Sequence, residues 1–246
     1  MADGWHVKAV SPPPKIALSV VIMAYNEAEN LPVQVARTAE FLRVHTSQWQ
    51  IVIVNDGSSD TTGEVADQLA AADPSHIDVV HHATNQGMGA AIRNGYQASR
   101  CAWITQLPAD CQVHPETFGA FIPLTQEADI ILSTYEKRDD GWLRKVLSGG
   151  FQWTVRLLMG QRGDFTGTMM FRSELLEKVG TLHSNTFFLN LEFPFKVLRL
   201  GTPFKVVQIE ALPRLSGTSK VRNLQRIRRV LGEIVQLRIR VWRGRD

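Results

Sequence analysis

The sequence predicts an α/β fold in which a doubly wound, mostly parallel sheet is flanked by helices. Two runs of β-branched residues, at 18–24 and 51–54, each stop at a polar turn and precede a helical pattern. The same alternation continues with short links to about residue 133, which is typical of parallel βαβ units. We therefore expect the polar turns to lie together at the carboxyl edge of the sheet, where open α/β sheets bind their ligands.

Each element follows from hydrophobic periodicity and from turn residues. In the first helix, Leu31, Val35 and Leu42 recur at helical spacing, and a run of Ser, Asp and Thr at 58–62 caps the second helix. Pro115 marks the first turn of a further helix. The expected strands are 18–24, 50–54, 77–81, 101–106 and 128–133, and the expected helices are 31–44, 62–72, 90–99 and one that starts at 114–116.

The pattern loosens after residue 134. There we expect an apolar helical stretch at 146–159, a strand at 165–171, a helix at 186–200, a strand at 205–211 and a long basic helix at 220–243. The 246 residues can bury one substantial core, and a hydrophobic content of 44% is that of an ordinary globular protein. The expected domains are a flexible leader at 1–15, one α/β domain at 16–213, and a cationic loop with a basic amphipathic helix at 214–246.

Charge is distributed unevenly along the chain. Residues 214–246 hold ten Lys or Arg and two acids, a charge of +8, while the whole chain carries +3. A basic amphipathic helix suits an anionic membrane surface, which we expect residues 220–245 to contact. The alternative is that the apolar stripe packs on the domain or on a second subunit, so a homodimer stays open. Nucleic acid is not an expected partner, because no base-reading motif accompanies the basic tail.

Cysteine content and hydropathy bear on the cellular compartment in which we expect the protein. Cys101 and Cys111 are too few for a disulfide framework and fit a reducing compartment. The apolar run at 16–24 is far shorter than the roughly 20 residues that span a bilayer. We therefore expect a cytoplasmic protein without a transmembrane segment that associates peripherally with the membrane.

Three polar clusters are candidates for chemistry. The glycine turn at 85–89 can bring backbone N–H groups close to an anion, but it follows the third strand, which disfavours a dinucleotide-binding oxidoreductase. Asp110 and Gln112 could bind a hard cation through oxygen, or form an ordinary solvated turn. Arg214 and Lys220 flank a Gly/Ser loop that could fold over phosphates, or form a basic linker.

These clusters occur in an order that resembles the family-2 glycosyltransferases with the GT-A fold, and among them the polyprenyl-phosphate (dolichol-phosphate) mannose or glucose synthases. The resemblance covers about residues 17–221. Its motifs are M-A-Y-N-E at 23–27, V-N-D-G-S-S-D at 54–60, N-Q-G-M-G-A-A at 85–91, D-F-T-G at 164–167 and R-L-S-G-T-S-K at 214–220. The resemblance implies an inverting enzyme that moves a hexose from a GDP- or UDP-sugar to a polyprenyl phosphate.

The resemblance also implies a role for each matched residue. Asp110 and Gln112 would hold Mg²⁺ or Mn²⁺ on the donor diphosphate, which Arg214 and Lys220 would grip. Glu192 lies where the family has an acid near the acceptor, and it is the candidate base if the acceptor is a hydroxyl. The residues that would line the nucleotide and its sugar are Ala24, Tyr25, Glu27, Asp56, Gly57, Gly87, Gly89, Arg93, Ala109, Thr166 and Gly167.

The metal motif departs from the family pattern. The family usually has D-A-D, whereas this chain has Pro108-Ala109-Asp110, so one anionic ligand is missing and weaker metal binding is expected. Met88 stands where a basic residue is frequent. Two further hypotheses therefore stay open: transfer to a soluble small molecule or glycan, and a non-catalytic module that binds a nucleotide sugar.

Overall fold

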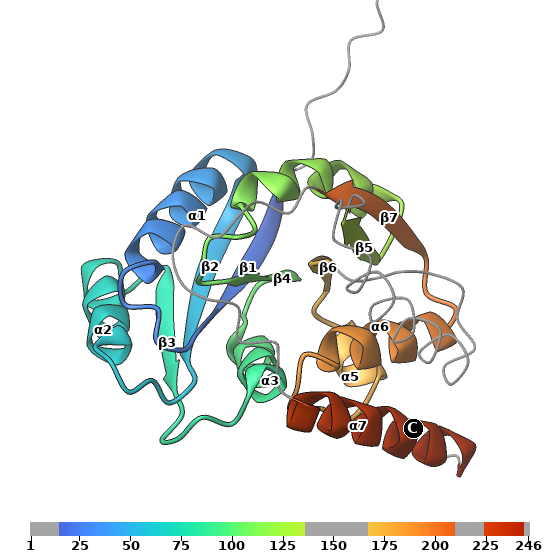
Figure 1. Ribbon diagram of the computed structural model, residues 1–246. Coiled ribbons are helices and arrows are strands. Elements are labelled where there is room, and N and C mark those ends of the chain that lie inside the picture. Colours follow the sequence, from blue (N-terminus) through green and yellow to red (C-terminus); the bar gives the residue numbers. More distant parts are fainter. Residues whose placement is uncertain (1–14, 136–166, 210–223, 244–246) are drawn as a thin grey trace, which may run out of the picture.

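The computed structural model describes residues 15–135, 167–209 and 224–243. They form a seven-stranded sheet in the order β3-β2-β1-β4-β6-β5-β7 (Figure 1). Neighbouring strands are parallel except at β6, which runs antiparallel to β4 and to β5. The mostly parallel sheet expected from the sequence is confirmed. The strands are β1 (Ile16–Ala24), β2 (Thr46–Asn55), β3 (Ile77–His81), β4 (Trp103–Pro108), β5 (Ile130–Tyr135), β6 (Met169–Arg172) and β7 (Phe204–Ile209).

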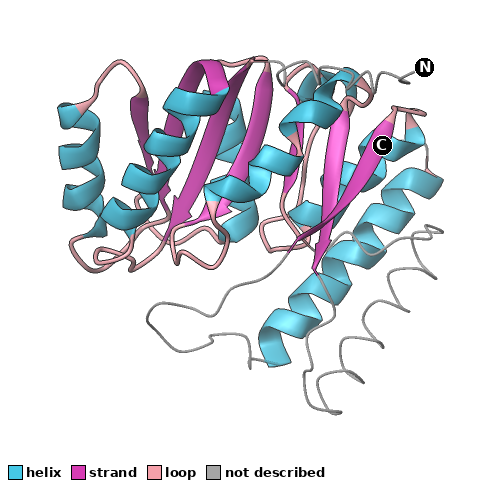
Figure 2. Cartoon of the chain, turned by 90° about the horizontal axis from the view of Figure 1, so that it is seen from above, coloured by secondary structure: helices cyan, strands magenta, loops and turns pink. Residues whose placement is uncertain are grey.

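Helices cover both faces of the sheet (Figure 2). One face packs against α1 (Leu31–His45), α2 (Thr62–Ala72) and the 3-10 helices η1 (Pro115–Ala120) and η2 (Ile122–Gln126). The other face packs against α3 (Met88–Ala98), α5 (Leu175–Lys178) and α6 (Leu189–Arg199).

The last helix, α7 (Leu224–Trp242), forms an outer layer on this second side of the sheet. It buries Val230, Ile234 and Leu237 in a cluster with Phe188 and Phe195, which lie at the start of α6 and within it. Part of the apolar face of α7 therefore packs on the protein, as the packing alternative expects.

The central strands explain why the sequence has runs of β-branched residues. In β1, Val20 packs in the core beneath α1, while its neighbour Val21 packs in the core beneath α3. Because both faces of a parallel sheet are covered, its inner strands have no polar face. This arrangement produces a continuous apolar run rather than an alternating pattern.

Two expectations about local structure need correction. A helical element does begin at Pro115, but it is the 3-10 helix η1 followed by η2 rather than one longer helix, because Pro123 has no N–H to donate and its ring would clash with the carbonyl four residues earlier. The strand expected at 165–171 begins only at Met169. The apolar stretch expected at 146–159 lies outside the described residues. The remaining expected elements are present, with ends shifted by a few residues.

Backbone hydrogen bonds join the turns after three strands. The N–H of Asp56 donates to the carbonyl of Ala24 at 2.9 Å, and the N–H of Ala109 donates to that of Met23 at 3.0 Å. The turns after β2 and β4 thus flank the end of β1, at the edge where the sequence placed the ligand. No helix within the described ranges is both long and apolar enough to cross a bilayer.

Candidate active site

The loop after β1 is interlocked with the loop after β2. Asn26 adopts a left-handed backbone conformation with φ 54°, which asparagine tolerates better than most residues. Its side-chain oxygen accepts from the N–H of Ser59 at 2.8 Å, and its own N–H donates to Ser58 Oγ at 3.0 Å. The N–H of Glu27 donates to Thr62 Oγ1 at 2.9 Å. The motifs at 23–27 and 54–60 therefore form one rigid corner of the edge.

Asp56 joins this corner to the glycine turn. The residue is 4% exposed, and one carboxylate oxygen accepts from the N–H of Gln86 at 2.8 Å while the other accepts from the N–H of Gly87 at 3.0 Å. The family resemblance implies that Asp56 contacts the nucleotide, which stays a prediction. In the structure its carboxylate binds the turn, so Asp56 can also act on a donor through the turn.

His82 is a site residue that the sequence analysis missed. Its ring is buried just after β3, with Nδ1 at 2.6 Å from Asp56 Oδ1 and Nε2 at 2.9 Å from Asn94 Nδ2. The ring therefore links the Asp56 carboxylate to the side chain of Asn94 on α3. The only signal in the sequence was a histidine directly after a strand, which is not specific.

The glycines of the turn, where the sequence predicts that an anion binds, also permit a close approach of the protein itself. The N–H of Gly89 donates to the carbonyl of Asn185 at 3.1 Å. A Cβ at Gly89 would lie 2.5 Å from the carbonyl oxygen of Thr186 and 2.6 Å from that of Ser184, and a Cβ at Gly87 would collide with the carbonyl oxygen of Asn185. These glycines are required because residues 182–186 pack directly on them.

Arg93, which was expected along the donor phosphates, binds the same loop. Its guanidinium donates to the carbonyl of Ser184 at 3.0 Å and to Asn185 Oδ1 at 2.9 Å. A third contact reaches the carbonyl of Leu182 at 3.4 Å. The guanidinium therefore fixes the loop at 182–186 against α3.

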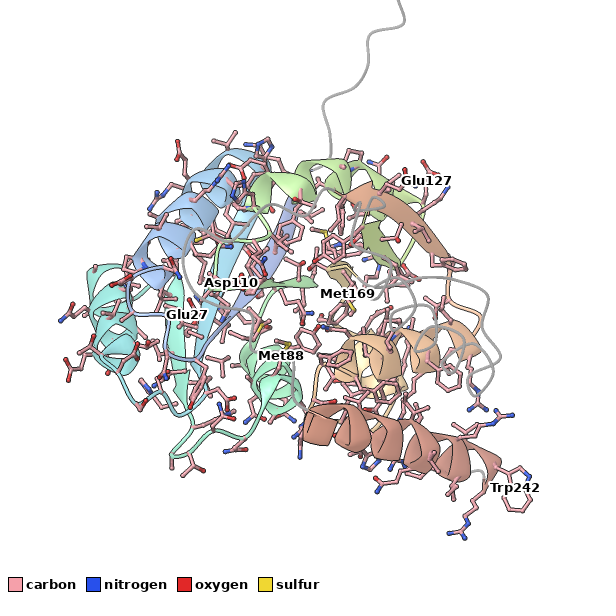
Figure 3. All side chains as sticks on the ribbon, in the orientation of Figure 1. Glu27, Met88, Asp110, Glu127, Met169 and Trp242 are labelled. Atoms are coloured by element: carbon pink, nitrogen blue, oxygen red, sulfur yellow. The ribbon has the colours of Figure 1, made fainter. Side chains whose placement is uncertain are left out.

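The turn after β4 contains the candidate metal ligands. Cys111 has φ 57°, and the N–H of Gln112 donates to Asp110 Oδ1 at 3.2 Å, which closes a tight turn. Burial raises the pKa of the Cys111 thiol, and the nearby carboxylates of Asp110 and Glu27 raise that pKa further. Asp110 precedes Cys111 in the chain, and Glu27 accepts from Asn30 Nδ2 at 2.7 Å, while the Asn30 carbonyl lies 3.8 Å from the Cys111 sulfur. Figure 3 shows Asp110 and Glu27 in the same region of the molecule, far from Glu127 and Trp242.

The oxygen atoms at this turn suit a divalent cation that a substrate helps to bind. Within the described ranges, no three side chains of His, Cys, Asp or Glu cluster as a self-contained metal site. Mg²⁺ commonly takes one or two carboxylates from the protein and further oxygens from substrate phosphates and water. Asp110 with Gln112, and Glu27 nearby, fits that kind of shared site.

Glu192, the candidate base, is buried and bound by backbone. It is 1% exposed, and its carboxylate accepts from the N–H of His183 at 3.0 Å and from that of Ser184 at 2.8 Å. Two cations balance its charge: Lys196 Nζ lies 3.8 Å and Arg240 3.9 Å from the carboxylate. These contacts make Glu192 a holder of the 182–186 loop, which differs from the expected base near an acceptor.

The remaining predicted residues are distributed as follows. Ala24 and Ala109 are buried at the ends of their strands, Tyr25 is exposed, and Gly57 adopts a positive φ of 65° where the chain passes Thr84 and Asn85. Gly167 donates its N–H to the carbonyl of Ser133, near the carboxyl end of β5. Thr166, Arg214 and Lys220 lie outside the described residues.

A separate cavity of about 300 Å³ lies between α1, η1 and the end of β7. Its lining includes Arg37, His114, Glu116 and Gln208. Arg37 and Glu116 are already paired across it at 2.7 Å. None of the predicted site residues is among the residues that line this cavity, which is therefore distinct from the loop cluster at the carboxyl edge of the sheet.

Comparison with known proteins gives consistent matches. The family model "Glycosyl transferase family 2" matches residues 19–180. A polyprenol monophosphomannose synthase from Mycolicibacterium smegmatis is 32% identical over 222 residues, which cover 82% of this chain and 80% of that protein. An undecaprenyl-phosphate 4-deoxy-4-formamido-L-arabinose transferase from Pectobacterium atrosepticum is 29% identical, and the match covers 82% of this chain but 62% of that longer protein.

The fold also matches solved structures. A glucosyl-3-phosphoglycerate synthase from Mycobacterium tuberculosis, in complex with Mn²⁺, UDP and phosphoglyceric acid, superposes with a TM-score of 0.66 at 15% identity, covering 91% of this chain and 78% of that one. This likeness bears on the fold, and it confirms the expected GT-A architecture. Taken with the family model and the sequence relatives, it leads to one assignment: the chain belongs to glycosyl transferase family 2, with relatives among the polyprenyl-phosphate sugar transferases.

Proposed function

We propose that this enzyme transfers a hexose from a nucleotide-diphosphate sugar to a polyprenyl phosphate, with inversion at the anomeric carbon. The observation that carries the proposal is the convergence of three motif-bearing loops at one edge of the sheet. The loops after β1 and β2 are interlocked there, and the Asp110 turn is bonded to the end of β1. Relatives that bear the names of polyprenol and undecaprenyl-phosphate sugar transferases support this choice of acceptor.

The donor diphosphate is proposed to bind at the Asp110 turn together with Mg²⁺ or Mn²⁺. Asp110 and Gln112 would hold the ion, and the missing carboxylate at Pro108 makes its binding depend on the diphosphate oxygens. When bound, the cation would neutralise charge on the leaving diphosphate. The Mn²⁺ and UDP in the Mycobacterium tuberculosis structure are in keeping with this arrangement.

The residues of the chain would act on the charge that develops as the sugar departs. Negative charge grows on the nucleotide diphosphate, so fixed positive groups lower the barrier. Arg214 and Lys220, from the motif at 214–220, are proposed to supply two of these groups. The interlocked corner and the glycine turn would hold the nucleotide in one orientation, which favours attack on the opposite face of the sugar.

The position of Glu192 bears on whether the acceptor is a phosphate or a hydroxyl. A lipid phosphate is already an anionic nucleophile, whereas a hydroxyl needs a carboxylate to take its proton. Glu192 was the candidate for that task, but its carboxylate is buried and accepts backbone N–H groups. Glu192 is therefore not placed to deprotonate a hydroxyl acceptor, which is in keeping with a lipid phosphate.

The outer face of α7 is proposed to rest on an anionic membrane surface, which would make the protein peripherally membrane-associated on the cytoplasmic side. Val235, Ile239 and Trp242 are exposed at helical spacing, with Trp242 84% exposed, and they form a second apolar stripe opposite the packed one. Exposed arginines at 238 and 243 accompany this stripe. Basic and aromatic side chains on one surface are typical of helices that bind anionic lipid interfaces.

Point variants test this membrane contact, since deletion of α7 would uncover the packed cluster around Ile234. Trp242→Ser with Ile239→Ser should weaken sedimentation with phosphatidylglycerol-containing vesicles. Phe204→Ser, at an exposed aromatic on the edge strand β7, is the matched control and should leave binding unchanged. Equal binding by both variants would contradict the assignment of this surface.

A transfer assay tests the central proposal. GDP- and UDP-sugars are supplied with Mn²⁺ or with a chelator, and the acceptor arms are polyprenyl phosphate and 3-phosphoglycerate. We expect metal-dependent product only in the lipid-phosphate arm. Product in the soluble arm would favour the alternative acceptor, and donor binding without transfer in any arm would favour a non-catalytic binding module.

A further inference from the structure

Residues 182–186 form a connecting loop that holds the glycine turn in place. The loop has no regular secondary structure, so its position depends on its side-chain and backbone contacts. On one side it lies against the glycine turn, where Asn185 accepts the N–H of Gly89 and Arg93 binds three of its acceptors. On the other side it is bound from α7.

Glu233 makes the contacts from α7. Its Oε2 accepts from Ser184 Oγ at 2.7 Å and from Thr186 Oγ1 at 2.6 Å, and its Oε1 accepts from the N–H of Asn185 at 3.2 Å. Glu233 is the single acid in the sequence of α7, which otherwise carries arginines. Figure 1 shows the amino end of α7 turned toward α3, the helix that the glycine turn begins.

The carboxylates of Glu192 and Glu233 thus both bind the loop at 182–186. Glu192 binds the N–H groups of His183 and Ser184 from α6, while Glu233 binds Ser184 Oγ, the N–H of Asn185 and Thr186 Oγ1 from α7. Hydrogen bonds to a charged acceptor are stronger than neutral ones. Arg93 binds the loop from the α3 side, and Glu233 supplies the contacts to Ser184, Asn185 and Thr186 on the α7 side. Removal of the Glu233 carboxylate should therefore loosen the second half of the loop beside Gly89.

We propose that Glu233 is a positioning residue for the donor site, which it sets from the C-terminal helix through Asn185 and the glycine turn. The inference rests on the proposed function for the identity of the donor. Asp56 carries the effect further, because it binds the N–H groups of Gln86 and Gly87 on the opposite side of the same turn. A change at α7 therefore reaches the nucleotide loops without any contact between Glu233 and the donor.

The test compares wild-type protein with Glu233→Ala, Glu233→Gln and the control Glu177→Gln, an exposed acid on α5. Amide hydrogen exchange is followed at 182–190 and 86–90, and the donor KM and kcat are measured with Mn²⁺. We expect faster exchange at both segments and a donor KM raised about tenfold in Glu233→Ala, with kcat little changed. Glu233→Gln keeps one acceptor oxygen and should fall between wild type and Glu233→Ala.

The outcomes separate this inference from the proposed function. Wild-type exchange at 86–90 and an unchanged donor KM in Glu233→Ala would overturn the positioning role. A fall in thermal stability alone, with donor KM and local exchange at 86–90 unchanged, would also overturn it. If the wild-type protein binds no nucleotide sugar, the proposed function fails, whereas the exchange at 86–90 still decides whether Glu233 holds the turn. If Glu233→Ala does not fold, Glu233→Gln decides by the same measurements.

Discussion

The two sides of the candidate site differ in how far along the chain their supporting residues lie. The corner formed by the loops after β1 and β2 is held by bonds between residues 26–27 and 58–62, which lie within its own motifs or directly after them. The glycine turn after β3 is held from outside by residues 182–186 and, behind them, by Glu233. The corner is therefore stabilised by its own loops, whereas the position of the glycine turn depends on residues from the second half of the chain.

The largest effect is expected at the Asp110 turn, which is bonded to the end of β1 beside the corner and where the donor diphosphate is proposed to bind. Asp110→Asn keeps the shape of the turn but removes the anionic ligand, so kcat should fall about 100- to 1000-fold. Asp78→Asn, at the opposite edge of the sheet where Asp78 pairs with Arg100 at 2.7 Å, is the control and should transfer sugar normally. Steady-state kinetics with Mn²⁺ measure the difference, and equal rates for the two variants would remove Asp110 from the mechanism.

The next effect is expected at Asp56, which joins the two sides. Asp56→Ala leaves the N–H groups of Gln86 and Gly87 and the ring of His82 without their acceptor. Each buried donor left unpaired costs about 1–3 kcal/mol, so the free energy of unfolding should fall by about 3 kcal/mol. Urea unfolding measures it, with Asp73→Ala at the amino edge as the control. A loss no larger than that of the control would mean that the turn does not depend on Asp56.

A smaller effect is expected where the loop at 182–186 packs on the glycine turn. In Gly89→Ala the new methyl group would collide with the carbonyl oxygens of Ser184 and Thr186, which should lower the free energy of unfolding by about 1–3 kcal/mol. Gly232→Ala, within α7, meets no atom of the described chain within 4 Å and should raise it by about 0.5–1 kcal/mol. Thermal unfolding of both variants measures the two changes. An unchanged free energy of unfolding in Gly89→Ala would show that the loop at 182–186 is not packed on the glycine turn.

The same contrast explains how far the sequence could predict the structure. The parallel strands and the corner at 23–27 and 54–60 were predictable, because hydrophobic runs and turn residues are local signals. The role of Glu233 was not, because it binds two hydroxyls and a backbone N–H about fifty residues away, groups that carry no periodic signal. The glycines at 87 and 89 were noticed, but a glycine permits close approach by a ligand or by the protein itself, and the sequence does not distinguish the two.

Hydrogen exchange of the whole protein with and without donor tests the central claim most directly, namely that the loops at the carboxyl edge form one nucleotide-sugar site. The wild-type protein is compared alone and with a GDP- or UDP-sugar and Mn²⁺. We predict slower exchange at 24–30, 56–60, 85–90 and 109–112, and no change at the opposite edge, at 73–77 and 200–203. Donor binding that instead protects only the segments around Arg37 and His114, which line the separate cavity, would contradict the account.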